Sequence, residues 1–126
     1  MQNNVSLFNR LLEGNKEWAK NAAVIVLIVS RKNFEYNEKF FVTHQFDAGA
    51  AWENFALEVF SKNLVCHGIQ GFDDEKTRIV LEVPNNFDVM AMIAVGKRGP
   101  KDILPKNYSK EIPNDRKPLS EIVIEG

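Results

Sequence analysis

The chain of 126 residues contains a single cysteine, Cys66. One thiol can form neither a disulfide within the chain nor a zinc site built from several cysteines. Disulfides are characteristic of oxidising compartments, so a lone cysteine favours the reducing cytoplasm, where we expect the protein to reside. Residues 1–6 also lack the basic and apolar stretches that define a secretory signal peptide.

Neither sign of charge is in excess. The 16 basic and 17 acidic residues leave a formal net charge of −1. A nucleic-acid-binding domain needs a basic surface to neutralise phosphates, and a polybasic membrane-binding protein needs one to attract acidic lipids. The longest apolar run, residues 22–29, is far shorter than the roughly 20 residues that span a bilayer. We therefore expect neither a nucleic acid nor a membrane as a partner.

The rest of the composition is that of a globular protein. Apolar residues make up 44% of the chain and charged residues 26%, which is a usual balance for a folded domain. The length allows one hydrophobic core of moderate size. We expect residues 1–126 to form a single domain, because no internal repeat and no low-complexity segment divides them.

Two short apolar runs, residues 24–29 and 89–96, predict strands that are covered on both faces. Residues 64–67 predict a third, shorter strand. Helical spacing of apolar side chains predicts helices over residues 5–13, 15–20, 44–63 and 73–81. The order of these elements predicts an α+β domain that resembles an α/β sandwich, with helices on both faces of a small sheet. Buried strands in so small a sheet suggest that neighbours come from another chain or from an absent segment.

The longest predicted helix, residues 44–63, has few polar positions. Its polar stripe consists of Asp47, Asn54, Glu58 and Ser61. A helix that is apolar around most of its girth lies in a core or at a subunit interface. Glu53 falls within the apolar arc, so we expect it to have a partner or to lie at a boundary, because burying an unpaired carboxylate is costly. Residues 31–43 predict a loop that folds back over the core, and residues 119–126 a tail that needs a surface to pack on.

The sequence contains no self-contained catalytic motif. His44 and His67 are its only histidines, and no set of carboxylates or cysteines around them has the spacing of metal ligands. Cys66 and His67 are neighbours on a predicted strand, so their side chains point to opposite faces and cannot form a nucleophile–base pair. We therefore predict no metal site and no catalytic side chain.

Two segments could bind a ligand. Residues 67–73 pass from a strand through a loop with two glycines, Gly68 and Gly71, to a helix capped by Asp73. Glycines let the backbone approach a flat ligand, and free amides there can donate to a ring nitrogen. Near the end, Arg116 and Lys117 form a pair of cations suited to a phosphate. Taken singly, an ordinary strand-to-helix turn and a solvated charge pair are the better explanations.

Four segments, in this order, resemble segments of the nitroreductase family of FMN-dependent flavoproteins. They are residues 13–22 with the apolar strand that follows, residues 47–54, residues 68–73, and residues 116–119 followed by Glu121. The resemblance covers almost the whole chain and is to the C-terminal half of the family's proteins. It implies a nitroreductase-like fold in which the N-terminal part is missing.

The resemblance also implies an obligate homodimer, with FMN bound in two sites at the subunit interface. The long helix would pack against its counterpart, and the tail would lie over the partner subunit. Gly68, Ile69, Gln70 and Gly71 would form the flavin-facing loop, with the amides of Gln70 and Gly71 near flavin N5. Arg116, with Lys117, would contact the phosphate. The implied reaction transfers hydride from NAD(P)H through the flavin to a nitroaromatic or a quinone, while the protein orients and tunes the cofactor.

The chain departs from the family pattern in three ways. The family's Arg-rich N-terminal helix and its Gln-Pro-Trp segment do not occur, and Gly68 stands where a proline is common. Three functional hypotheses follow. The chain is an FMN-dependent NAD(P)H oxidoreductase, either short-form or half of a split gene. Alternatively, it is a non-enzymatic truncated remnant or dimerisation module with an incomplete flavin site, or it is a subunit that needs a separate N-terminal chain.

Overall fold

The computed structural model describes residues 4–106, 108–110, 112 and 115–124. Its 3-stranded antiparallel sheet has the strand order β1-β3-β2. The strands are β1 (Val24–Arg31), β2 (Val65–Ile69) and β3 (Phe87–Gly96). Each of them overlaps a run that the sequence predicts to be a strand, although β2 begins one residue later and ends two residues later than predicted.

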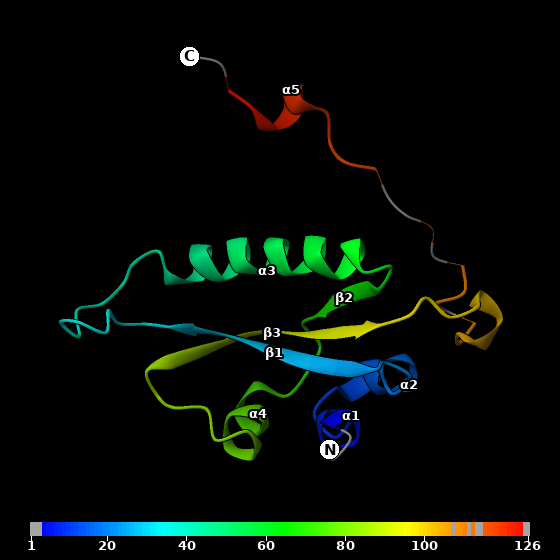
Figure 1. The fold of residues 1–126 in the computed structure, drawn as a ribbon, viewed down its shortest axis with the longest axis horizontal. Helices are drawn as coiled ribbons and strands as arrows, with labels where there is room; N and C mark the ends of the chain where they lie inside the picture. Colours follow the sequence, from blue (N-terminus) through cyan, green and yellow to red (C-terminus); the bar gives the residue numbers. More distant parts are fainter. Residues whose placement is uncertain (1–3, 107, 111, 113–114, 125–126) are drawn as a thin grey trace.

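Helices cover both faces of the sheet. The long helix α3 (His44–Ser61) lies on one face, and the short helices α1 (Asn4–Phe8), α2 (Lys16–Ala19) and α4 (Asp74–Val80) lie on the other (Figure 1). Two single-turn 3-10 helices, η1 (Glu13–Asn15) and η2 (Lys101–Ile103), and a last short helix, α5 (Leu119–Ile122), complete the order. The predicted α+β architecture is therefore confirmed. Of the helices in the described residues, none combines the length and apolar character that a membrane crossing requires.

Alternate side chains of the strands enter two different cores. Ile93 of β3 packs with Val59 of α3 on one face. Met92 of the same strand packs with Ile25 and with Leu11 on the other face. Because side chains of a strand alternate between faces, a strand with a core on each side must be apolar at successive positions. The unbroken apolar runs in β1 and β3 therefore have a direct structural cause.

The sheet is paired unevenly. Strand β3 lies in the centre, pairing with β1 from Val24↔Val95 to Arg31↔Phe87 and with β2 from Val65↔Gly96 to Ile69↔Met92. Within the described part of the chain, β1 and β2 each pair along one edge only. A register shift follows Ile28, and the next residue, Val29, is 38% exposed. The prediction that residues 24–29 are covered throughout is thus wrong at this last position, because the bulge turns the strand away from the core.

Helix α3 buries only one side against the sheet, through Trp52, Phe55 and Val59. Its outward side carries apolar residues, and Phe46, Leu57 and Phe60 are 77%, 58% and 78% exposed. Glu53 is exposed, so of the two expectations for this carboxylate the boundary position is the one observed. In a single chain, the helix is therefore not surrounded by core, and its apolar outer side lacks a cover among the described residues.

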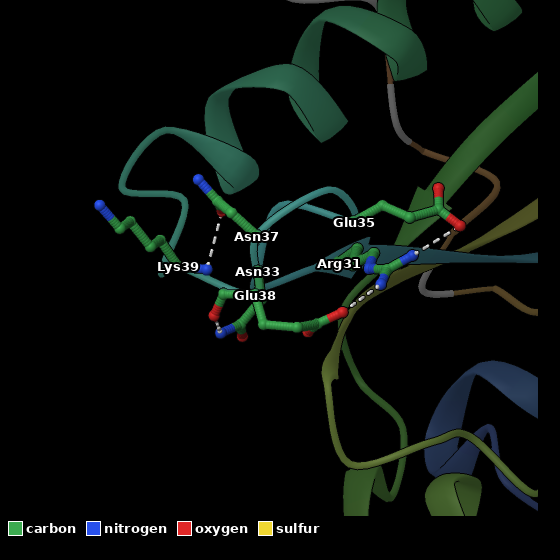
Figure 2. A network of polar contacts seen from close by, with 6 residues as sticks. All are labelled: Arg31, Asn33, Glu35, Asn37, Glu38 and Lys39. Atoms are coloured by element: carbon green, nitrogen blue, oxygen red, sulfur yellow. Dashed lines mark hydrogen bonds and ion pairs between the residues drawn. The ribbon is translucent and has the colours of Figure 1, made fainter.

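The segment between β1 and α3 does not fold back over the core. It projects beyond the end of the sheet (Figure 1), where Phe34 stacks on Phe41 with ring centroids 4.4 Å apart. A polar network closes it: Arg31 pairs with Glu35 at 3.5 Å and with Glu38 at 3.2 Å, and the Asn33 side-chain amide donates to the Glu38 carbonyl at 2.6 Å (Figure 2). The prediction was wrong because these local contacts satisfy the loop without the core.

A further prediction differs from the structure at its boundary. The first helix ends at Phe8 rather than Glu13, because the chain turns there so that Leu11 and Leu12 enter the core. At the other end, the tail extends past α3 and its α5 helix lies apart from the sheet (Figure 1). Leu119 and Ile122 of α5 are exposed, so the tail has no packing surface within the described residues.

Replacing Met92 by alanine should lower the free energy of unfolding by about 2–5 kcal/mol, because its fully buried side chain leaves a cavity in the centre of the sheet. Urea unfolding followed by circular dichroism measures this change. Val42→Ala is the matched control, because Val42 is 80% exposed and its truncation should change stability by less than about 0.5 kcal/mol. Equal losses for the two variants would contradict the assignment of Met92 to the core.

Candidate functional site

The connection between β2 and α4 contains the loop that the sequence singles out. Asp73 ends it as the N-cap of α4, and its side chain accepts a hydrogen bond from the Lys76 N–H at 2.9 Å. This satisfies one of the free amides at the start of the helix, and the carboxylate also complements the helix dipole. The predicted cap is therefore confirmed, and it fixes the end of the loop.

The loop is shorter than predicted. Gly68 and Ile69 belong to β2, where they pair with Ile93 and Met92. The Ile69 side chain is only 3% exposed, so burial of a β-branched residue extends the strand at the expense of the loop. Gly68, Gln70 and Gly71 of the predicted flavin-facing loop are exposed, but only Gln70 and Gly71 lie outside the strand. Whether Gly68 and Ile69 contact a cofactor stays a prediction.

The amides of Gln70 and Gly71 lack internal acceptors. The next two N–H groups are used, because Phe72 donates to the Gln70 carbonyl at 2.8 Å and Asp73 donates to the Leu11 carbonyl at 3.0 Å. No hydrogen bond from the Gln70 or Gly71 N–H reaches another residue of the described ranges. Because exposed amides without a partner readily donate to a ligand, this turn presents two donors to an external acceptor.

The segment before β1 holds this turn in place through a side-chain hydrogen bond. The Asn15 side chain donates to the Gly71 carbonyl at 3.0 Å and accepts from the Trp18 indole N–H at 3.2 Å. The Trp18 ring meets the His67 ring edge-on, with centroids 5.1 Å apart and planes at 85°. A segment 56 residues away in sequence therefore holds the loop. The sequence analysis did not identify Asn15 or Trp18 as site residues, because no local pattern signals this contact.

The predicted cations, Arg116 and Lys117, do not lie next to this turn. Arg116 and Lys117 are exposed in the coil that precedes α5, past the side of α3 that faces away from the sheet, whereas the β2–α4 turn lies toward the opposite side of the molecule (Figure 1). Neither cation forms an ion pair within the described residues. The turn offers the donors that a flavin ring edge needs, and Arg116 and Lys117 offer those that a phosphate needs. One chain does not bring the two sets together.

A cavity of about 390 Å³ lies at the other end of β2. Trp18, Val65 and His67 contribute to its wall, and Lys97 and Arg98 to its rim. Its lining contains no acidic residue and none of the predicted cofactor residues. Gln70 and Gly71 are not part of its lining, but Trp18 and His67 belong both to its wall and to the contacts that hold the Gln70–Gly71 turn. In the sequence, the basic pair Lys97 and Arg98 between Gly96 and Gly99 could have indicated this cavity.

A buried polar cluster brings together a serine, a histidine and an aspartate. The Ser30 hydroxyl donates to the His44 carbonyl at 2.6 Å and lies 2.8 Å from His44 Nδ1. Because its one proton is used, the hydroxyl must accept from an Nδ1–H. His44 Nε2 lies 3.9 Å from Asp88, which also pairs with Lys32 and Arg78. Ser30 and His44 are both buried, so this cluster ties elements together rather than attacking a substrate.

Among the described residues, the remaining reactive groups are not arranged as a metal site, and Cys66 is a poor nucleophile. Burial, followed by the nearby negative charge of Glu53, raises the pKa of the Cys66 thiol above its ordinary value. A raised pKa leaves the thiol protonated near neutral pH and weakly nucleophilic. In the part of the chain that the structure describes, no three His, Cys, Asp or Glu side chains are close enough together to hold a metal ion.

Comparison with known proteins adds to this geometry. The family model described as the nitroreductase family matches residues 2–97. A solved oxidoreductase containing FMN is 38% identical, with a TM-score of 0.91 over 98% of this chain and 65% of that chain. This chain therefore spans less than two thirds of that relative. No curated protein sequence matches the chain.

Two more distant structures show the same fold. A nitroreductase family protein from Streptococcus pneumoniae TIGR4 is 20% identical, with a TM-score of 0.71 over 99% of this chain and 75% of that one. A chain from Exiguobacterium sibiricum 255-15, solved in complex with FMN, is 9% identical, with a TM-score of 0.75 over 100% and 73%. The fold thus persists where sequence identity is low.

Alkylation of Cys66 by iodoacetamide should be slow at neutral pH and should accelerate above the ordinary pKa of a thiol, because the raised pKa delays thiolate formation. Glu53→Gln removes the smaller of the two causes and should shift the rate profile toward lower pH. Mass spectrometry of the modified fraction against time and pH measures the profile. An unshifted profile in this variant would exclude the contribution of Glu53.

Ser30→Ala should lower the free energy of unfolding by about 1–3 kcal/mol, because it leaves the buried Nδ1–H of His44 without an acceptor. Ser61→Ala is the control, since its exposed hydroxyl donates to the Glu58 carbonyl at 2.8 Å and lies 3.4 Å from the Glu58 carboxylate, both on the surface of α3, and its removal should cost less than about 0.5 kcal/mol. Thermal and urea unfolding compare the two. A neutral Ser30→Ala variant would show that the cluster does not stabilise the fold.

Proposed function

The chain belongs to the nitroreductase family, and on that basis we propose that it binds FMN and acts as an FMN-dependent oxidoreductase. The observation that carries this proposal is the exposed turn at Gln70 and Gly71, whose two amides have no acceptor among the described residues. The 38% identity to an oxidoreductase that contains FMN supports it. When bound, FMN supplies hydride acceptance from NAD(P)H and electron transfer to a small nitroaromatic or quinone.

The residues of this chain bind and orient rather than react. The N–H groups of Gln70 and Gly71 donate to a ring nitrogen of the flavin, and Gly68 and Ile69 set their direction as the end of β2. Arg116 and Lys117 take the phosphate, where a guanidinium can donate two parallel hydrogen bonds. No side chain is assigned as a catalytic acid or base. The lone cysteine of the chain, Cys66, supports a location in the reducing cytoplasm.

We propose that the site forms between two copies of the chain. The outward side of α3 exposes Phe46, Leu57 and Phe60, and burial of each such side chain contributes about 1.5–3 kcal/mol. The apolar residues of α5 need a surface as well. In such a dimer, the tail of one copy would lie over the other copy. Its Arg116 and Lys117 would then reach the Gln70–Gly71 turn of that other copy, which the copy's own tail does not reach. Residues 1–126 would then act as one domain of a homodimer.

One observation supports the second hypothesis, that the chain is a non-enzymatic module with an incomplete flavin site. The chain spans 65% of the FMN-containing relative, so groups from the remainder of that fold are outside the match. A dimerisation module without enzymatic activity is therefore the second candidate. The free edges of β1 and β2 also suit a separate chain that completes the sheet, as the third hypothesis requires.

Titration of the purified protein with FMN tests the first hypothesis. We expect quenching of flavin fluorescence at micromolar FMN and FMN-dependent oxidation of NADH or NADPH with a quinone acceptor. Arg116→Ala should weaken FMN binding about 10- to 100-fold, because it removes a charge-assisted phosphate contact. Lys110→Ala is the matched control, since it removes a cation from the same tail at a position outside the proposed site.

The hypotheses predict different outcomes. FMN binding without NAD(P)H oxidation would favour the non-enzymatic module. Failure to bind FMN, with recovery on addition of a separate N-terminal chain, would favour the split protein. Equal FMN affinity for Arg116→Ala and the wild type would remove Arg116 from the phosphate site.

A further inference from the structure

Both ends of the Asn15 side-chain amide are engaged. Its nitrogen donates to the Gly71 carbonyl at 3.0 Å, and its oxygen accepts from the Trp18 indole N–H at 3.2 Å. This pattern defines which way the amide points, because an indole can only donate. Trp18 is in turn held edge-on against His67 of β2. These contacts therefore link β2 through Trp18 and Asn15 to the turn that follows β2.

The Gly71 carbonyl, which accepts a hydrogen bond from Asn15, fixes the direction of the Gly71 N–H in the neighbouring peptide. The Gly71–Phe72 peptide has its carbonyl on Asn15 and its N–H on the Gln70 carbonyl at 2.8 Å. The Gln70 carbonyl thus points into the turn. In a trans peptide the N–H lies opposite the carbonyl, so the Gly71 N–H points the other way. No cis peptide bond occurs in the described residues.

The same contact explains why residue 71 is a glycine. No glycine of the described chain has a positive φ, so backbone conformation does not require glycine here. A Cβ at position 71 would lie 2.7 Å from Asn15 Nδ2, closer than a real Cβ approaches a nitrogen. That nitrogen is held by its hydrogen bond and by Trp18, so it has little freedom to move. Asn15 and Gly71 are therefore a matched pair.

We propose that Asn15 is a positioning residue, which locks the Gly71 carbonyl and thereby aims the Gly71 N–H at the flavin. The inference rests on the proposed FMN site for its consequence, but the locking itself is a property of the protein without cofactor. Two other contacts reinforce it, from the Asp73 N–H to the Leu11 carbonyl at 3.0 Å and from the Lys76 side chain to the Arg10 carbonyl at 3.4 Å. Both attach the far end of the loop to the same segment.

Asn15→Asp is the most informative variant. It preserves size and the acceptor for Trp18, but it replaces the donor to Gly71 by an oxygen that repels the carbonyl. Amide hydrogen exchange in the protein without cofactor should become about 3- to 10-fold faster at Phe72, whose N–H depends on the turn. Asn21→Asp adds the same charge to the same segment, where no side-chain hydrogen bond of Asn21 occurs among the described residues, and should leave this exchange unchanged.

The affinity and the redox potential of bound FMN test whether Asn15 orients the Gly71 N–H toward the flavin. FMN should bind Asn15→Asp about 3- to 10-fold more weakly than the wild type. An N–H donor to a ring nitrogen stabilises the oxidised flavin more than the reduced one, which carries its own proton there. Relative to Asn21→Asp, which adds the same charge to the same segment, the two-electron potential of bound FMN should therefore rise by about 15–30 mV, which is that fold-change converted at 29.6 mV per decade. A residue that only stabilises the fold would not move the potential.

A double-mutant cycle tests the matched pair. Gly71→Ala should weaken FMN binding in the wild-type background by more than it does in an Asn15→Ala background, because the obstructing nitrogen is then gone. Gly14→Ala is the control for a methyl group added beside Asn15, since nothing lies within 4 Å of its Cβ position. Urea unfolding of every variant verifies that each remains folded. Additive effects of the Asn15 and Gly71 changes would overturn the pairing.

The outcomes separate this inference from the proposed function. If the wild type binds FMN while Asn15→Asp retains wild-type affinity, potential and Phe72 exchange, the inference is wrong and the proposed function stands. If the wild type does not bind FMN, the proposed function fails. Exchange at Phe72 then decides whether Asn15 locks the turn, and unchanged exchange would overturn the locking as well.

Discussion

Strand β3 exchanges backbone hydrogen bonds with β1 along one edge and with β2 along the other, and it is covered on both faces. A strand in that position must have every N–H and C=O paired and apolar side chains on both faces. The other elements are arranged to meet this requirement. Helix α3 closes one face, α1, α2 and α4 close the other, and Gly96 lets the start of β1 approach within 3.3 Å of its Cβ position.

Surfaces far from β3 are less completely satisfied by one chain. The outer edges of β1 and β2, the outward side of α3 and the apolar residues of α5 all lack a cover among the described residues. The Gln70–Gly71 turn lies toward the side of the molecule opposite to the tail, and the Asn15 side chain and the Leu11 carbonyl attach its loop to the segment before β1.

Polar groups inside the fold serve structure rather than catalysis. Ser30, His44 and Asp88 have the residue types of a hydrolytic triad, yet the serine proton is used by a backbone carbonyl and both Ser30 and His44 are buried. Cys66 is similarly unsuited to nucleophilic chemistry, because burial raises its pKa. A family whose cofactor performs the redox chemistry needs donors in fixed directions instead, and in the proposed site the backbone of Gln70 and Gly71 would supply them.

Local pattern alone determined the two apolar strands, the long helix and the Asp73 cap, because periodicity and capping are properties of neighbouring residues. The family was predicted from the resemblance of four segments, in order, to a known family. Local pattern could not determine that Ile69 prolongs β2, that Leu11 and Leu12 leave the first helix for the core, or that residues 31–43 project outward. Each of those depends on which surface is available in three dimensions. The same holds for Asn15 and Gly71, 56 positions apart. Only the tertiary structure decided that they meet, because a contact between distant segments leaves no periodic trace in either of them.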